Sequence, residues 1–177
     1  MSTGNNHVVL IGMMGVGKST VGRLLAARLG WDFWDNDEAL SATTGTTAAE
    51  LQLASGADVL HATEGRLLRE ALSRTEPTVF AAAASVVLDP EALAGAVTVW
   101  LRASDDQDAD QIARSGQQHR PLPEDAAPVL RRLIDSRRSM YERLADITVD
   151  VEGRPNGICD RVIEALAARS SASPPPS

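Results

Sequence analysis

The sequence predicts an α/β fold in which a five-stranded parallel sheet carries helices on both faces. Short apolar runs alternate with longer stretches of helical spacing, which is typical of repeated β–α units. A glycine-rich turn joins the first apolar run to the first helical stretch. The 177 residues suffice for one domain with a substantial core.

The expected elements follow this alternation along the chain. The run from His7 to Ile11 predicts a buried strand, and Val21, Leu25 and Leu29 then recur at helical spacing. The other strands are expected at the later short apolar runs, near residues 31–35, 77–82, 96–101 and 146–151. Helices are expected near residues 18–29, 37–43, 47–54, 57–73, 105–113, 125–143 and 157–168.

Two segments break the regular alternation within a single domain expected over residues 1–168. Residues 37–73 add helical pattern between the second and third strands, and residues 114–124 form a polar, arginine-bearing stretch. Ligands of open parallel sheets bind beyond the carboxyl ends of the strands, where such connections emerge. We therefore expect a substrate-binding region at 37–73 and a lid at 114–124. Residues 169–177, rich in serine and proline, are expected to form a disordered tail.

The glycine-rich turn itself is the most specific motif of the chain. Residues Gly12 to Ser19 read Gly-Met-Met-Gly-Val-Gly-Lys-Ser and satisfy the G-x-x-x-x-G-K-[ST] phosphate-binding pattern between a strand and a helix. Its glycines reach backbone angles forbidden to other residues and bring N–H groups close to phosphate oxygens. The expected nucleotide-binding residues here are Gly12, Gly15, Val16, Gly17, Lys18, Ser19 and Thr20. A glycine turn of purely structural use is the alternative.

Two side chains of this motif have separate expected tasks. Lys18 reaches the β- and γ-phosphates of a bound nucleotide, and Ser19 offers its hydroxyl to Mg²⁺. Thr20 belongs to the start of the helix, whose N-terminus faces the anion. The motif thus predicts a nucleotide with Mg²⁺ as the bound cofactors.

Two carboxylates follow directly after the second expected strand. Asp35 is expected to hold a Mg²⁺-bound water, and Asp37 to orient an acceptor hydroxyl or to accept its proton as general base. The alternative is structural: Asp35 ends the strand and Asp37 caps the next helix, with Glu38 in its first turn. The phosphate-binding motif upstream favours a functional role for at least one of the two.

Composition excludes several classes of function. The formal charge of −7 and the few aromatic residues disfavour nucleic-acid binding. The sequence shows neither an apolar run near 18 residues nor a leader segment, so a cytoplasmic protein without membrane contact is expected. Cys159 is the single cysteine, which excludes an intramolecular disulfide. Nothing in the pattern argues against a monomer.

The chain resembles shikimate kinases over nearly its whole length, to about residue 168. The features that carry the resemblance are Gly12 to Ser19, Asp35-x-Asp37, Gly56 to Glu64, Arg120-Pro121-Leu122, and Arg137 four residues before Tyr141. The resemblance implies a P-loop NTPase fold of the nucleoside-monophosphate-kinase-like branch, with small substrate-binding and lid segments. It also implies transfer of the ATP γ-phosphoryl group to a ring hydroxyl of a small carboxylated polyol.

The same resemblance assigns roles to individual positions. Lys18, Asp37 and Arg120 match catalytic residues, and Arg120 matches the lid arginine near the γ-phosphate. Arg114 resembles the arginine near adenine, and Arg137 matches an arginine on the substrate carboxylate. The alternative for Arg137 is a solvated helix face with i, i+4 partners.

Two positions depart from the family pattern. His61 stands where the family carries an arginine, so we expect weaker binding of an acceptor carboxylate, at a cost of about 2 to 5 kcal/mol if the lost contact is buried. Ala83-Ala84-Ser85 stands where the family carries three glycines, and alanines resist positive φ, so a reshaped loop is expected. His61, Ala83 and Ala84 are nevertheless candidate acceptor contacts, and His61 is otherwise a half-buried or surface residue.

Three functions remain open from the sequence. The first is a small-molecule kinase of the shikimate kinase type with an altered acceptor site. The second is an ATP-binding regulatory or partner-binding paralogue without metabolic kinase activity, which the changes at His61 and Ala83 favour and the retained Asp37 and Arg137 disfavour. The third is a gluconate-type sugar-acid kinase.

Overall fold

The computed structural model describes residues 7–104 and 127–172, and it confirms the predicted five-stranded parallel sheet. The strand order is β2-β3-β1-β4-β5, so β1 lies at the centre between β3 and β4. The strands are β1 (His7–Ile11), β2 (Asp32–Asp35), β3 (Thr78–Ala81), β4 (Val97–Arg102) and β5 (Ile147–Asp150). All four pairings are parallel, and all five strands lie within the predicted runs or one residue beyond them.

Helices connect the strands, as the sequence predicts. The α-helices are α1 (Lys18–Leu29), α2 (Asn36–Thr44), α3 (Ala48–Ser55), α4 (Ala57–Leu72), α6 (Ala127–Leu144) and α7 (Pro155–Ala172). Two 3-10 turns that the sequence did not indicate, η1 (Ala84–Leu88) and η2 (Pro90–Leu93), follow β3. The helix expected at 105–113 and the lid expected at 114–124 lie outside the described residues.

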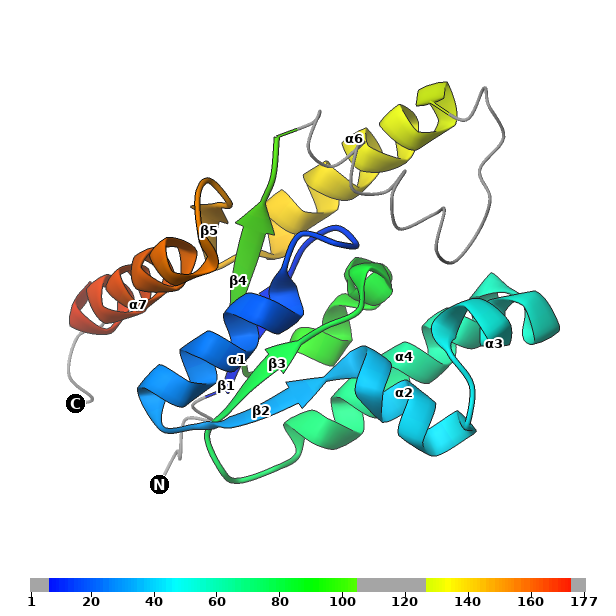
Figure 1. Cartoon of the computed structure of the whole chain (residues 1–177), viewed down its shortest axis with the longest axis horizontal. Helices are drawn as coiled ribbons and strands as arrows, with labels where there is room; N and C mark the ends of the chain where they lie inside the picture. Colours follow the sequence, from blue (N-terminus) through cyan, green and yellow to red (C-terminus); the bar gives the residue numbers. More distant parts are fainter. Residues whose placement is uncertain (1–6, 105–126, 173–177) are drawn as a thin grey trace.

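Side chains of the central strand alternate between two apolar layers. Val8 and Leu10 pack with α1 and α7, whereas Val9 and Ile11 pack with α2, α4 and α6. Figure 1 shows α1 and α7 together on one side of the sheet, with α3 farther from it beyond α2 and α4. Both faces of β1 are therefore covered, as its unbroken apolar run requires.

The inserted segment between β2 and β3 folds into the three helices α2, α3 and α4. Gly45 ends α2 in the left-handed conformation at φ 72°. Thr47 then caps α3 through a reciprocal capping box with Glu50, whose carboxylate accepts from the Thr47 N–H at 2.8 Å. These capping interactions thus determine where α2 ends and α3 begins, which the helical pattern of the sequence defines only to within a few residues.

The C-terminal helix is longer than predicted. It continues to Ala172, so the expectation of a disordered tail from residue 169 is wrong for its first four positions. The hydroxyls of Ser170 and Ser171 donate to the carbonyl oxygens of Leu166 and Ala167 at 3.1 and 3.0 Å. These serines bond back to the preceding turn, which is compatible with continued helix. Residues 173–177 lie outside the described part.

Across the residues described, none of the helices combines the length and apolar character that crossing a bilayer demands.

A matched pair of leucine truncations tests the core. Leu68 on α4 is fully buried, whereas Leu53 on α3 is 79% exposed. We expect Leu68→Ala to lower the free energy of unfolding by about 2 to 5 kcal/mol because it leaves a cavity. Leu53→Ala is expected to change it by less than about 0.5 kcal/mol. Urea unfolding followed by circular dichroism measures both, and equal losses would contradict the packing described here.

Candidate active site

The phosphate-binding motif forms a tight loop at the carboxyl end of β1. Gly12 has φ 149°, and a Cβ atom there would lie 2.7 Å from the carbonyl oxygen of Leu101 on β4. Gly17, at φ 99°, directly precedes α1. Gly12 is needed for the close approach to β4, and Gly17 is needed for the left-handed turn into the helix. The loop is therefore built as its sequence pattern predicts.

The lysine of the motif folds back over its own loop. Its Nζ donates to the carbonyl oxygens of Gly12 and Met13 at 2.8 and 2.9 Å. Val16 places its side chain in the core and donates its backbone N–H to Met13 at 3.3 Å, while Thr20 is exposed in the first turn of α1. The ammonium group of Lys18 thus lies at the mouth of the loop, where phosphate oxygens would meet it.

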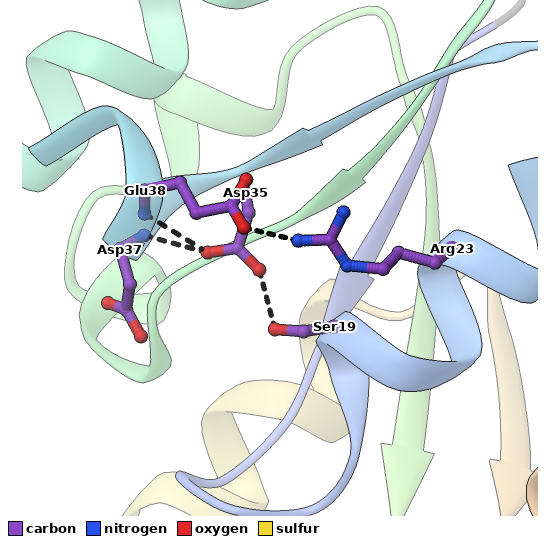
Figure 2. A network of polar contacts seen from close by, with 5 residues as sticks. All are labelled: Ser19, Arg23, Asp35, Asp37 and Glu38. Carbon is purple, nitrogen blue, oxygen red and sulfur yellow. Dashed lines mark hydrogen bonds and ion pairs between the residues drawn. The ribbon is translucent and has the colours of Figure 1, made fainter. Parts of the chain in front are cut away.

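A hydroxyl and a carboxylate meet between α1 and β2. Ser19 Oγ donates to Asp35 Oδ2 at 2.5 Å, and Asp35 is buried (Figure 2). Hydroxyl and carboxylate oxygens are the ligands that Mg²⁺ prefers, and Mg²⁺ is commonly held by one or two carboxylates together with substrate phosphates. The described residues contain no cluster of three or more acidic, histidine or cysteine side chains that could cage a metal. This pair therefore fits Mg²⁺ bound jointly with a nucleotide.

Asp35 also caps the next helix. Its Oδ1 accepts the backbone N–H groups of Asp37 and Glu38 at 2.9 and 3.4 Å. The alternative in which Asp37 caps α2 is therefore wrong, because Asp35 holds that position and Asp37 lies in the first turn. Figure 2 shows the Asp37 carboxylate turned away from Ser19 and from the Arg23–Glu38 ion pair. The side chains of Asp35 and Asp37 thus point to different sides of the turn between β2 and α2.

Glu64 on α4 is a buried carboxyl that interacts electrostatically with Asp37, Arg137 and Lys18. It is 7% exposed, and it accepts a hydrogen bond from the hydroxyl of Ser85. Burial raises the pKa of Glu64, the Ser85 hydrogen bond opposes this, Asp37 raises the pKa further, and Arg137 and Lys18 lower it. Side chains from α2, α4, α6 and the phosphate loop therefore share one electrostatic environment.

The turn after β3 is held by α6. The carbonyl oxygen of Ala84 accepts from Arg137 Nη1 at 2.6 Å and from the Tyr141 hydroxyl at 2.8 Å. Ala83 has φ −60° and ψ 150°, and the described residues contain no positive φ outside glycine. The turn thus uses angles that suit alanine. Arg137 contacts this backbone rather than forming a merely solvated helix face.

His61 lies near Arg137, one helical turn before Glu64 on α4. Its ring is half-buried, and burial lowers the pKa of the imidazole. The positive charge of Arg137 lowers this pKa further, while Asp58 opposes the shift. An imidazole normally titrates near pH 6.5, so His61 is neutral at physiological pH.

Comparison with known proteins agrees with this arrangement. The family model described as shikimate kinase matches residues 14–167. A shikimate kinase of Streptomyces avermitilis is 34% identical over 171 residues, covering 93% of this chain and 98% of that protein. The chain belongs to the shikimate kinase family. It is accordingly an ATP-dependent small-molecule kinase, a phosphotransferase that acts on a hydroxyl group.

Solved structures show the same fold. The shikimate kinase of Aquifex aeolicus superimposes with a TM-score of 0.83 at 24% identity, covering 94% of this chain and 99% of that one. A shikimate kinase of Acinetobacter baumannii in complex with shikimate gives a TM-score of 0.82 at 25% identity, covering 92% and 93%. The P-loop fold predicted from the sequence is therefore confirmed.

The structure groups the candidate residues of this kinase into two adjacent sets. One set follows β1 and β2 and contains the phosphate loop, Lys18, Ser19 and Asp35. The other lies around Glu64 and contains Asp37, Ala84, Arg137 and, beside Arg137, His61. Arg114 and Arg120 lie outside the described residues.

No ligand-binding role was predicted for Glu64 or Ser85. A signal for Glu64 is present in the sequence, because Leu60 and Leu68 stand four positions before and after it on the apolar face of α4. A carboxyl group in that stripe is buried by the helix register, and buried carboxyls need a partner. No local pattern shows that Ser85 supplies it, since the two residues are 21 positions apart.

Removal of the loop ammonium tests the nucleotide half of the site. We expect Lys18→Ala to weaken binding of a non-hydrolysable Mg²⁺·ATP analogue by about 1.5 to 3 kcal/mol, roughly ten- to a hundredfold, because a charge-assisted contact to phosphate is lost. Isothermal titration calorimetry measures this. Arg66→Ala is the control, since it removes an exposed cation paired with Glu70 on α4. Equal affinity in both variants would contradict the assignment.

The buried carboxyl predicts a specific pH dependence of stability. Because the pKa of Glu64 is raised on folding, the unfolded chain ionises first, and this residue loses stabilising effect as pH rises through its folded pKa. We expect the wild type to lose stability relative to Glu64→Gln as the pH rises above about 4, where a glutamate of the unfolded chain ionises. Urea unfolding at successively higher pH measures the difference. Glu91→Gln corrects for loss of one exposed carboxylate, and a parallel profile for both variants would refute the prediction.

Proposed function

We propose that this kinase transfers the γ-phosphoryl group of Mg²⁺·ATP to a hydroxyl of a small polar metabolite bound beside Glu64. The arrangement around Glu64 carries the proposal: Ser85 donates to this carboxyl, and Arg137 donates to the neighbouring Ala84 carbonyl. Asp37 and Lys18 lie within electrostatic range of the same carboxyl. Groups suited to a hydroxyl-bearing acceptor lie there within electrostatic reach of the lysine of the phosphate loop. Phosphoryl transfer depends mainly on such positioning and on charge stabilisation.

The nucleotide half uses backbone and side-chain donors of the loop. Main-chain N–H groups between Gly12 and Ser19 bind phosphate oxygens, and Lys18 exchanges its two carbonyl contacts for the β- and γ-phosphates. Ser19 and Asp35 would hold Mg²⁺, which supplies further neutralisation of phosphate charge. Glycine at position 12 keeps the loop close to β4, so its amides have a fixed direction.

The acceptor half uses Asp37 and Arg137. The Asp37 carboxylate orients the acceptor hydroxyl toward the γ-phosphorus, or takes its proton as the new P–O bond forms and ADP leaves. Arg137 keeps further N–H donors beyond the one bonded to Ala84, and these bind a polar group of the acceptor. Tyr141 holds the same carbonyl and so fixes the turn against which Arg137 lies.

Shikimate is the first acceptor to assay, since relatives are named shikimate kinase and one was solved in complex with shikimate. Formation of ADP and of a phosphorylated product, in the presence of Mg²⁺·ATP and a panel of polyols and sugar acids, tests the proposal. Nucleotide binding without phosphorylation of any acceptor would instead support a regulatory or partner-binding role. Phosphorylation of gluconate alone would support a sugar-acid kinase.

Replacement of Asp37 tests the acceptor half. We expect Asp37→Asn to lower kcat by about 10² to 10⁴ because the amide cannot accept the proton and holds the hydroxyl less strongly. Affinity for the ATP analogue is expected to stay within about twofold. Asp32→Asn is a matched control, because Asp32 is exposed at the opposite end of the same strand from Asp35. Equal kcat for the two variants would exclude Asp37 from the reaction.

A further inference from the structure

We propose that the acceptor site selects an uncharged polyol over its carboxylated counterpart, because His61, Glu64 and Ser85 give the site hydrogen-bonding groups, and residues 7–104 and 127–172 supply no second cation for a carboxylate there. This inference rests on the proposed function and specifies its substrate class. It follows from three features of the described residues: the supply of cations, the acidic groups that oppose them, and the fixed position of one buried carboxyl.

The supply of positive charge at the acceptor position is small. Of the residues that the structure describes, the cations that act on Glu64 are Arg137 and Lys18. Lys18 contacts the phosphate loop, and Arg137 already donates from Nη1 to the Ala84 carbonyl at 2.6 Å. Arg137 is therefore the described cation on the acceptor side, and part of its donor capacity is used within the chain.

His61 adds no second cation. Its ring is half-buried on α4 near Arg137, and burial together with that guanidinium lowers the pKa of the imidazole. A neutral imidazole donates one hydrogen bond and accepts another, which suits a hydroxyl group. It gives little compensation to a buried carboxylate, which needs a charged partner to offset its loss of hydration.

Within the described part of the chain, acidic groups near the acceptor position outnumber the cations there. Asp37 acts on Glu64 from α2, and Asp58 acts on His61 from the same helix. A carboxylated acceptor would place a further anion among these groups, with Arg137 as its main counter-charge. A hydroxyl in the same place donates to a carboxylate and accepts from Arg137, so it satisfies both kinds of neighbour without a net charge.

The Ser85–Glu64 hydrogen bond fixes the position of the Glu64 carboxyl among these charged groups. Ser85 on η1 is 8% exposed, and its hydroxyl donates to Glu64 Oε2, so the carboxyl is held within the packed layer between α4 and η1. The rest of this carboxyl keeps lone pairs that accept from a polyol hydroxyl. Glu64 and Asp37 thus offer hydrogen-bond acceptors to a hydroxyl of the substrate, whereas a substrate carboxylate in the same place would be repelled.

Two matched substrate pairs test the inference. Shikimate is compared with its hydroxymethyl analogue, in which the carboxylate is replaced by CH₂OH, and gluconate is compared with glucitol. ADP formation gives kcat/KM, and mass spectrometry identifies the phosphorylated product. We expect kcat/KM for the better neutral substrate to exceed that of its carboxylated partner by at least about tenfold.

The outcomes separate this inference from the proposed function. Preference for the carboxylated member of a phosphorylated pair overturns the inference and leaves the kinase assignment intact. Failure to phosphorylate any of the four compounds, or a wider set of cyclitols and sugar acids, overturns the proposed function and the inference with it. The ratio of kcat/KM for the neutral and carboxylated substrates, measured on the wild-type protein, decides between these outcomes without any variant.

Two variants then locate the discrimination. His61→Arg places a guanidinium beside Arg137 and is expected to shift the neutral-to-carboxylated ratio of kcat/KM at least about tenfold toward the carboxylated substrate. His61→Gln is the matched control, because it keeps a neutral side chain with a donor and an acceptor. Equal ratios in the two variants would overturn the assignment of selectivity to the charge at this position.

Discussion

The pairing of β1 with both β3 and β4 is the constraint on which the site depends. Because all three strands run in parallel, their carboxyl ends lie at the same edge of the sheet, where β1 continues into the phosphate loop and β3 into the turn at Ala84. The pairing extends past the strands, since Ala82 donates its N–H to Leu10 at 3.1 Å and Gly12 closes against Leu101. The phosphate loop and the turn at Ala84 are therefore fixed relative to each other by main-chain contacts.

Much of this arrangement could be predicted from residues close together in the sequence. The five strands follow from apolar runs, and the loop from Gly12 to Ser19 follows from a motif that is itself local. The sequence predicted separate roles for Asp35 and Asp37 and offered Asp37 as the alternative cap of α2, whereas the structure has Asp35 as the capping residue. Which of two aspartates separated by one residue caps the helix depends on where β2 ends, and the sequence does not determine that end to a single residue.

The acceptor half was harder to predict because its contacts join distant segments. Ser85 meets Glu64 across 21 positions, and Arg137 meets Ala84 across 53. Periodicity shows that Glu64 is buried on α4, but only the packing of α4 against η1 identifies its partner. The extension of α7 to Ala172 was missed for a simpler reason, since serine-rich composition does not show hydroxyls bonding back along a helix.

The Ala84 carbonyl links acceptor chemistry to core stability. Tyr141 donates to it from a fully buried position, and its ring stacks on Trp100 of β4 with centroids 5.8 Å apart. Arg137 donates to the same oxygen one turn earlier on α6. Tyr141, a core residue, thus fixes the carbonyl oxygen to which the Arg137 guanidinium is bonded. The core therefore helps to position this guanidinium. Because Arg137 is fixed, we expect the preference between neutral and carboxylated acceptors to depend on residues of α4 near Arg137, such as His61.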